Sequence, residues 1–112
     1  MNKFLQIKNF SKDQLLQIIE DKCDETFLEY KTIGFLFEKP STRTRVSFFT
    51  GIVQLKGNVI DLRYEDLNIS REESFEDTFK AMNCYLDGLI YRTTNHDKLI
   101  EASKYFDKPI IN

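Results

Sequence analysis

The chain has 112 residues, of which 41% are hydrophobic and 30% are charged, a composition typical of one globular domain. Sixteen Lys and Arg residues face eighteen Asp and Glu residues, and the formal net charge of -2 argues against a nucleic-acid binder that relies on general attraction to phosphates. No signal peptide is visible, and no apolar run approaches the roughly 18 residues that a membrane span needs, so we expect a cytosolic protein without membrane contact.

The first predicted elements are a helix, a strand and a second helix. Ser11 and Gln14 form a capping-box pattern ahead of an apolar stripe, which predicts an amphipathic helix over 12–25. The nearly continuous apolar run 32–38 is typical of a strand that is covered on both faces. Residues 42–56 again place apolar side chains at helical spacing.

The middle of the chain predicts a strand, a loop and a helix. Gly57 is the expected C-terminal stop of the preceding helix, and 58–62 forms a second short strand. Residues 63–73 are polar and charged, which indicates a loop. Ser74 is the expected cap of a helix over roughly 75–86, whose first turn carries acidic residues that the helix dipole favours.

The last predicted elements are a third strand, a helix and a fourth strand. The strands cover 87–92 and 108–112, and the helix over 96–106 is capped by Thr94 or Asn95. Strands that alternate with helices predict an α/β fold, with a parallel sheet, right-handed crossovers and helices on both faces in three layers.

Several polar residues receive structural interpretations. Cys23 and Cys84 form no CxxC pair and lie in predicted helices, so we expect buried thiols and neither a disulfide nor a metal site. His96 is interpreted as a surface or capping residue. Lys98 and Lys104 are expected on an exposed helix face.

The segment "PSTRTR" lies where the first apolar strand meets the following helix. The first turn of a helix leaves backbone N–H groups without partners and carries partial positive charge. The hydroxyls of Ser41, Thr42 and Thr44 add donors, and the guanidinium of Arg43 suits phosphate oxygens. The segment therefore predicts an oxyanion site. Without GxxxxGK[ST] or GxGxxG, it is neither a nucleotide P-loop nor a dinucleotide fingerprint.

A simpler interpretation remains for each basic residue in this region. Ser41 can merely cap the helix, with Arg43 and Arg45 solvated or paired with acids. However, cations in a first helical turn are disfavoured, and an anion removes that conflict. Arg92 follows another predicted strand and emerges at the same sheet edge, although one such Arg can simply face solvent. Two basic clusters at one edge favour the anion site.

The segment "FEKPSTRTRVSF" resembles the carbamoyl-phosphate signature of the aspartate/ornithine carbamoyltransferases, whose core is S-T-R-T-R. The blocks "QLKGNVIDL", "ESFEDT", "YLDGLIYRT" and "KPIIN" follow in the family's order. The resemblance implies two α/β domains with the active site between them, in a homotrimer that shares sites across subunits. It identifies 1–112 as the carbamoyl-phosphate-binding domain, with the amino-acid-binding domain absent from this chain.

The resemblance also implies roles for individual residues. Arg92 would reach the phosphate and the carbamoyl oxygen, and Arg45 would support the loop through internal pairing. No metal or cofactor is implied. The residues that would hold the phosphate are Ser41, Thr42, Arg43 and Thr44.

The sequence departs from the family pattern at several positions. Phe49 stands where the family usually has Glu. Asn68 and Arg71 lie near the usual Gln and basic positions of the loop that reaches a neighbouring subunit's site. The His-Pro-Cys/Thr-Gln segment is missing because the chain ends at Asn112, and His96 cannot replace it. We therefore expect a chain that cannot catalyse transfer alone.

The Lys before Pro40 and the "RT" at 92–93 resemble ornithine enzymes more than aspartate enzymes. The implied reaction transfers a carbamoyl group from carbamoyl phosphate to the ornithine side-chain amine, giving citrulline and phosphate in arginine biosynthesis. Three alternatives stay open: an aspartate-type domain, a non-catalytic binding or assembly module that kept the fold, and a catalytic variant completed by a separately encoded second half.

Overall fold

A computed structural model describes residues 3–63, 67 and 74–112. In these residues, five strands form one sheet in the order β1-β5-β4-β2-β3, and every neighbouring pair is parallel. The parallel α/β prediction is confirmed. The strands are β1 (Lys3–Phe4), β2 (Thr32–Phe37), β3 (Asn58–Arg63), β4 (Gly88–Arg92) and β5 (Ile110–Ile111).

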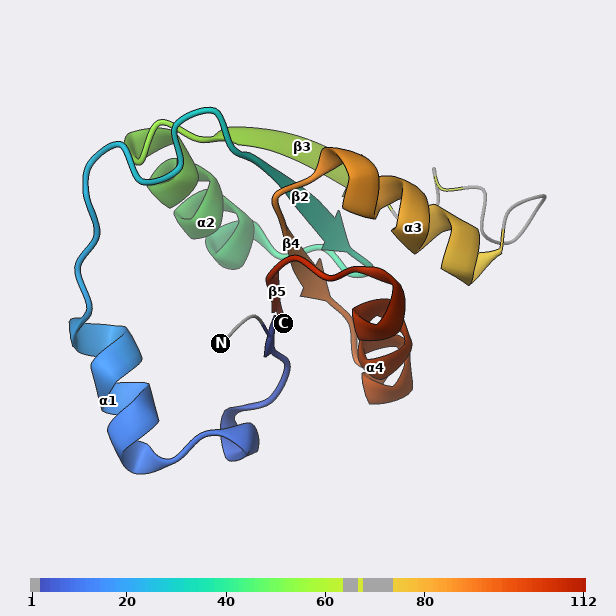
Figure 1. The fold of residues 1–112 in the computed structure, drawn as a ribbon, viewed down its shortest axis with the longest axis horizontal. Coiled ribbons are helices and arrows are strands. Elements are labelled where there is room, and N and C mark those ends of the chain that lie inside the picture. The colour runs from blue at the N-terminus through green and yellow to red at the C-terminus, as the bar shows by residue number, and fades with distance from the viewer. Residues whose placement is uncertain (1–2, 64–66, 68–73) are drawn as a thin grey trace.

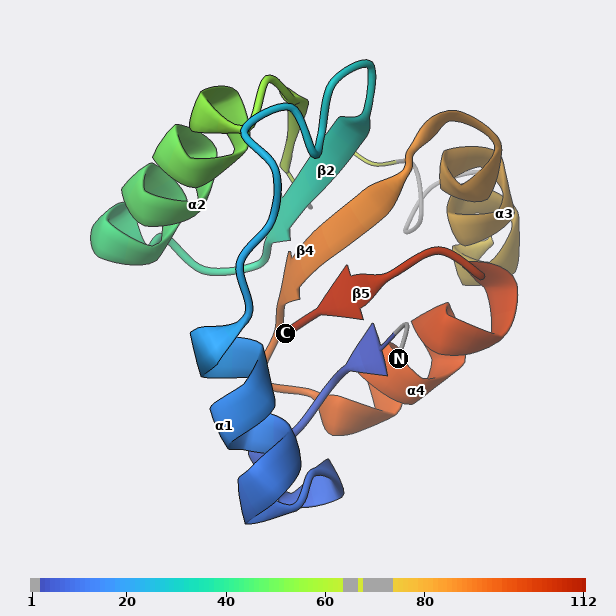
Figure 2. The same ribbon diagram turned by 60° about the vertical axis from the view of Figure 1, so that its left-hand side comes forward.

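Helices cover both faces of the sheet, as Figures 1 and 2 show. The helix α2 (Thr42–Gln54) packs on one face, and α3 (Phe75–Tyr85) and α4 (His96–Tyr105) pack on the other. The three-layer prediction is thereby confirmed. A 3-10 turn, η1 (Ile7–Asn9), precedes α1 (Lys12–Glu20), which has no buried residue.

Two buried clusters explain the layers, because the side chains of β2 alternate between them. Phe35 and Phe37 pack with Ile52 of α2, whereas Leu36 packs with Phe79 of α3 and with α4. All but the first residue of β2 are buried. This is why the strand is a nearly continuous apolar run rather than an alternating one.

Two boundaries near the N-terminus differ from the prediction. The helix α1 ends at Glu20 rather than at residue 25, because Asp21 is extended and the Asp24 carboxylate accepts a hydrogen bond from the Thr26 N–H in a local turn. The predicted capping box of Ser11 and Gln14 is confirmed. The strand β1 was not predicted, since two residues show no periodicity.

The end of α2 also differs from the prediction. Lys56, not Gly57, adopts the left-handed conformation, with φ 69°. The Gly57 N–H donates to the Ile52 carbonyl at 2.8 Å and the Lys56 N–H to the Val53 carbonyl at 3.0 Å, a Schellman ending. Glycine is needed at 57 for space, because a Cβ there would lie 2.8 Å from Ile52 Cγ2.

Three side-chain predictions are wrong. Cys23 and Cys84 are exposed, Cys23 because α1 ends before it and Cys84 because it lies on the outer side of α3. Lys98 is half-buried, because its ammonium pairs with Glu38 beyond the end of β2. None of the helices formed by the described residues has the length and apolar character that crossing a membrane requires.

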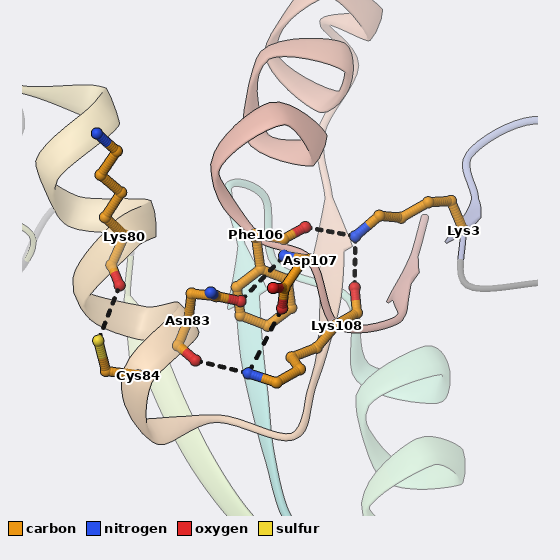
Figure 3. Close-up of polar contacts among 7 residues, drawn as sticks. All are labelled: Lys3, Lys80, Asn83, Cys84, Phe106, Asp107 and Lys108. Atoms are coloured by element: carbon orange, nitrogen blue, oxygen red, sulfur yellow. Dashed lines mark hydrogen bonds and ion pairs between the residues drawn. The ribbon is translucent and has the colours of Figure 1, made fainter.

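The amino-terminal edge of the sheet is held by internal polar contacts, shown in Figure 3. The Lys3 ammonium donates to the Phe106 and Lys108 carbonyls. Asn83 at the end of α3 accepts from the Asp107 N–H at 2.9 Å and from the Lys108 ammonium at 2.8 Å. Burial lowers the pKa of Lys3, and the nearby Asp107 carboxylate partly offsets that effect.

Candidate functional site

The sheet topology places a crevice between the carboxyl ends of β2 and β4. The chain leaves β2 through α2 toward β3 on one side, and leaves β4 through α4 toward β5 on the other. Open α/β sheets bind ligands where the strand order reverses in this way. The register places Arg92 beside Phe37, the last residue of β2. The prediction that Arg92 and the "PSTRTR" turn reach the same edge is confirmed.

A pocket of about 340 Å³ occupies this crevice. Phe37 and Ile90 form part of its apolar lining. Thr44 from the first turn of α2 and Arg92 from the end of β4 bring hydroxyl and guanidinium donors to it, and Lys39 adds an ammonium. An apolar pocket with a few converging polar groups is the usual form of a small-ligand site.

The five residues predicted to bind the anion do not all line this pocket. Ser41 and Thr42 line a second pocket of about 490 Å³ on the β3 side of the turn, together with Arg63. The two pockets share Phe37 and Lys39. Arg43 is exposed on the first turn of α2 and lines neither of them. The predicted residues therefore surround the N-terminus of α2 rather than one enclosed cavity.

The N-terminus of α2 differs from those of the other α-helices in the described part of the chain. Ser41 is the N-cap, but its side chain makes no capping hydrogen bond. The caps of α1, α3 and α4, namely Ser11, Ser74 and Asn95, all accept such bonds. These three helices also carry an acid in the first turn, and α2 carries none. In the first turn of α2, therefore, no side chain of the helix accepts from the free backbone N–H groups, and no acid offsets the partial positive charge.

Of the three arginines to which the sequence analysis assigned a role at this edge, one is ion-paired within the described residues and two are not. Arg45 pairs with Asp61 of β3 and stacks over the Phe37 ring at 5.4 Å, which confirms the prediction that it is paired internally. Within residues 3–63, 67 and 74–112, neither Arg43 nor Arg92 has an ion-pair partner. Both residues are exposed.

Other residues near the site complete the inventory. Lys39 lines both pockets, but the sequence analysis gave it no part in the anion site. Its position just before Pro40, at the end of a predicted strand, could have indicated such a part. Phe49 is 48% exposed beside Phe35. Asn68 and Arg71 lie outside the described residues. The described residues contain no cluster of three or more His, Cys, Asp or Glu side chains that could hold a metal ion.

Comparison with known proteins gives a consistent result. Residues 2–112 match the family model described as "Aspartate/ornithine carbamoyltransferase, carbamoyl-P binding domain". An ornithine carbamoyltransferase of Haloquadratum walsbyi is 38% identical over 117 aligned residues, which cover 99% of this chain and 39% of the relative.

Solved structures agree. An ornithine carbamoyltransferase from Pyrococcus furiosus superposes with a TM-score of 0.87 at 29% identity, over 99% of this chain and 39% of the other. An aspartate transcarbamoylase from Trypanosoma cruzi superposes with a TM-score of 0.69 at 30% identity, over 76% of this chain and 26% of the other. The chain spans about two fifths of the length of the ornithine enzymes that it matches. It belongs to the aspartate/ornithine carbamoyltransferase family, whose carbamoyl-P binding domain it matches over residues 2–112.

Proposed function

We propose that this chain binds carbamoyl phosphate as the carbamoyl-phosphate-binding domain of an ornithine-type carbamoyltransferase. The observation that carries the proposal is the N-terminus of α2, where Ser41 leaves its hydroxyl unused and no first-turn acid is present. Arg92 stands at the adjacent strand end, without an ion-pair partner in the described structure. An unfilled helix N-terminus with an added guanidinium favours a phosphate group.

The proposed contacts of these residues follow from where negative charge develops in the reaction. Ser41, Thr42, Arg43 and Thr44 hold the phosphate with hydroxyl, guanidinium and backbone N–H donors. Arg92 bridges the phosphate and the carbamoyl oxygen. When an amine nitrogen attacks the carbonyl carbon, negative charge grows on that oxygen, and the bond from carbon to the phosphate oxygen then breaks. Fixed positive donors at both positions lower the barrier.

The acceptor is the second part of the proposal. Relatives that are 38% identical to this chain are named ornithine carbamoyltransferases, and they support ornithine over aspartate. We place the binding of the acceptor amine outside residues 2–112, and propose a homotrimer in the cytoplasm that acts in arginine biosynthesis. Light scattering measures the mass of the assembly, and a monomer at high protein concentration contradicts the trimer for this chain.

Isothermal titration of inorganic phosphate and of carbamoyl phosphate tests the site. Replacing Arg92 by Ala removes a charge-assisted donor, and we expect a loss of affinity of about 10-fold or more. Lys104 is the control, because Lys104→Ala also removes one positive charge and Lys104 lies in the last turn of α4, outside both pockets. Lys104→Ala should bind within about twofold of the unmodified chain. A folded chain with no heat of phosphate binding contradicts the proposal.

A further inference from the structure

Glu38 carries a negative charge beside the proposed anion site, just before the turn that leads to Ser41. Its carboxylate accepts a hydrogen bond from Lys98 Nζ of α4 at 2.7 Å, and its side chain is only 16% exposed. Its backbone N–H donates to the Arg92 carbonyl at 3.1 Å. Glu38 therefore contacts both the end of β4, through its backbone N–H, and the helix α4, through its carboxylate.

The alternation of the strands puts the two charges on opposite faces of the sheet. On β2, Phe37 packs toward α2 and Leu36 toward α3 and α4, so Glu38 follows the face of Leu36. On β4, Ile90 belongs to the cluster on the α2 side, and Arg92 follows that face and lines the crevice pocket. Both strands end at the same edge, and Glu38 lies one residue beyond Phe37, the register partner of Arg92.

A hydrogen-bonded turn positions the backbone of Lys98 in the first turn of α4. The Asn95 N–H donates to Thr93 Oγ1 at 3.1 Å, and Asn95 Oδ1 accepts from the N–H groups of Asp97 and Lys98 at 3.0 and 3.4 Å. A cation in a first helical turn is unfavourable with respect to the helix dipole. The Glu38 carboxylate offsets that effect, so the pair places one charge of each sign at the helix start.

We propose that Lys98 is a positioning residue that holds the Glu38 carboxylate on the α4 face and so prevents it from pairing with Arg92. The inference rests on the proposed anion site. Without Lys98, the carboxylate becomes an internal competitor for the guanidinium that binds phosphate.

Titration of inorganic phosphate into charge-matched variants tests this inference. Lys98→Met removes the ion pair with Glu38, and we expect phosphate affinity to fall about 5-fold. Glu38→Gln combined with Lys98→Met has the net charge of the unmodified chain and removes the competitor, so affinity should return to within about twofold. Lys104→Met, also on α4, has the net charge of Lys98→Met and should bind like the unmodified chain.

Two outcomes overturn the inference. If Lys98→Met binds phosphate normally, Glu38 does not compete for Arg92. If the double variant stays as weak as Lys98→Met, the pair acts through loop geometry and not through charge.

An unmodified chain that binds no phosphate contradicts the proposed function instead. In that case, thermal unfolding of the same variants and of the single variant Glu38→Gln tests whether Lys98 holds Glu38. Each single substitution should lower the midpoint by roughly 2–5 °C, and the double variant should fall no further. Additive losses would show that the two side chains do not hold each other.

Discussion

Two helices of this protein have a serine at the N-cap, but only one of these serines caps its helix with its side chain. Ser74 caps α3 by accepting the Asp77 N–H at 3.1 Å, with Glu76 and Asp77 in the first turn. Ser41 stands at the same position of α2, but its side chain makes no capping bond and its first turn has no acid. One helix N-terminus is completed by its own side chains, and the other is left open.

The difference indicates that α3 is built for stability, whereas the proposed site uses the open N-terminus of α2 for binding. A capping hydroxyl and first-turn acids stabilise α3 through groups that are always present. The N-terminus of α2 gives up these contributions, and Arg43 in its first turn adds unfavourable charge. Binding of an external anion would remove that conflict, so the proposed site predicts that ligand binding stabilises α2 and leaves α3 unaffected.

The largest expected effect comes from converting the start of α2 into that of α3. Arg43→Glu with Thr44→Asp gives α2 the acids that α3 has at the equivalent positions. Because the acids repel phosphate and complete the helix end, affinity should fall at least about 100-fold. The free energy of unfolding should rise by about 0.5–1 kcal/mol. Calorimetry and urea unfolding measure the two effects.

The reciprocal change is the control for this conversion. Glu76→Arg with Asp77→Thr removes both acids from the first turn of α3 and should destabilise that helix. We expect no phosphate site there, because the Ser74 side chain still accepts the N–H of residue 77. Phosphate binding that survives in the converted α2 would show that the anion does not bind at this helix end.

A smaller effect separates the two serines directly. Ser74→Ala removes a used cap and should lower the free energy of unfolding by about 1 kcal/mol. Ser41→Ala removes no capping bond, so the loss should stay below about 0.3 kcal/mol, while phosphate affinity falls about 3- to 10-fold with the lost hydroxyl. Urea unfolding and phosphate titration of both variants provide the comparison. Equal destabilisation would mean that Ser41 caps α2 in solution.

Sequence patterns predicted most of the helices and strands, because the spacing of apolar residues indicates which side chains are buried. The strand β2 and the helices α2, α3 and α4 were predicted within a few residues, since each has an apolar face that packs on the sheet. The strand β1 was missed because its two residues owe their conformation to pairing with β5. The end of α1 was placed too late, because no packing contact extends that helix.

The sequence predicted which edge of the sheet carries the candidate site but not the geometry of that site. Sequence placed Arg92 at the right edge, but only the strand order β5-β4-β2 sets it beside Phe37. The same serine-first pattern precedes α2 and α3. The acids of the first turn are visible in the sequence, but the missing capping bond of Ser41 follows from the backbone, with ψ 105° at Ser41 and 157° at Ser74. Contacts between distant segments, such as Lys98 with Glu38, have no local signature.

The smallest expected effect concerns the amino-terminal edge, where the polar groups are satisfied internally as they are at α3. Burial lowers the pKa of Lys3 below its usual 10.5. Between the lowered value and 10.5, the folded chain binds fewer protons at Lys3 than the unfolded chain does. Stability therefore rises as the pH increases toward 10.5, and burial of the charged form costs stability below that window.

Lys3→Met removes this contribution, so the free energy of unfolding of the unmodified chain, measured relative to Lys3→Met, should rise with pH in the alkaline range. Urea unfolding of both proteins at several pH values up to 10.5 measures the difference. The Asp107 carboxylate opposes the shift, so the slope should be shallow. Phosphate affinity should be the same in both proteins at neutral pH, because Lys3 lies at the edge opposite the open end of α2. Parallel stability curves would mean that Lys3 keeps its ordinary pKa, and altered phosphate affinity would mean that the two edges are not independent.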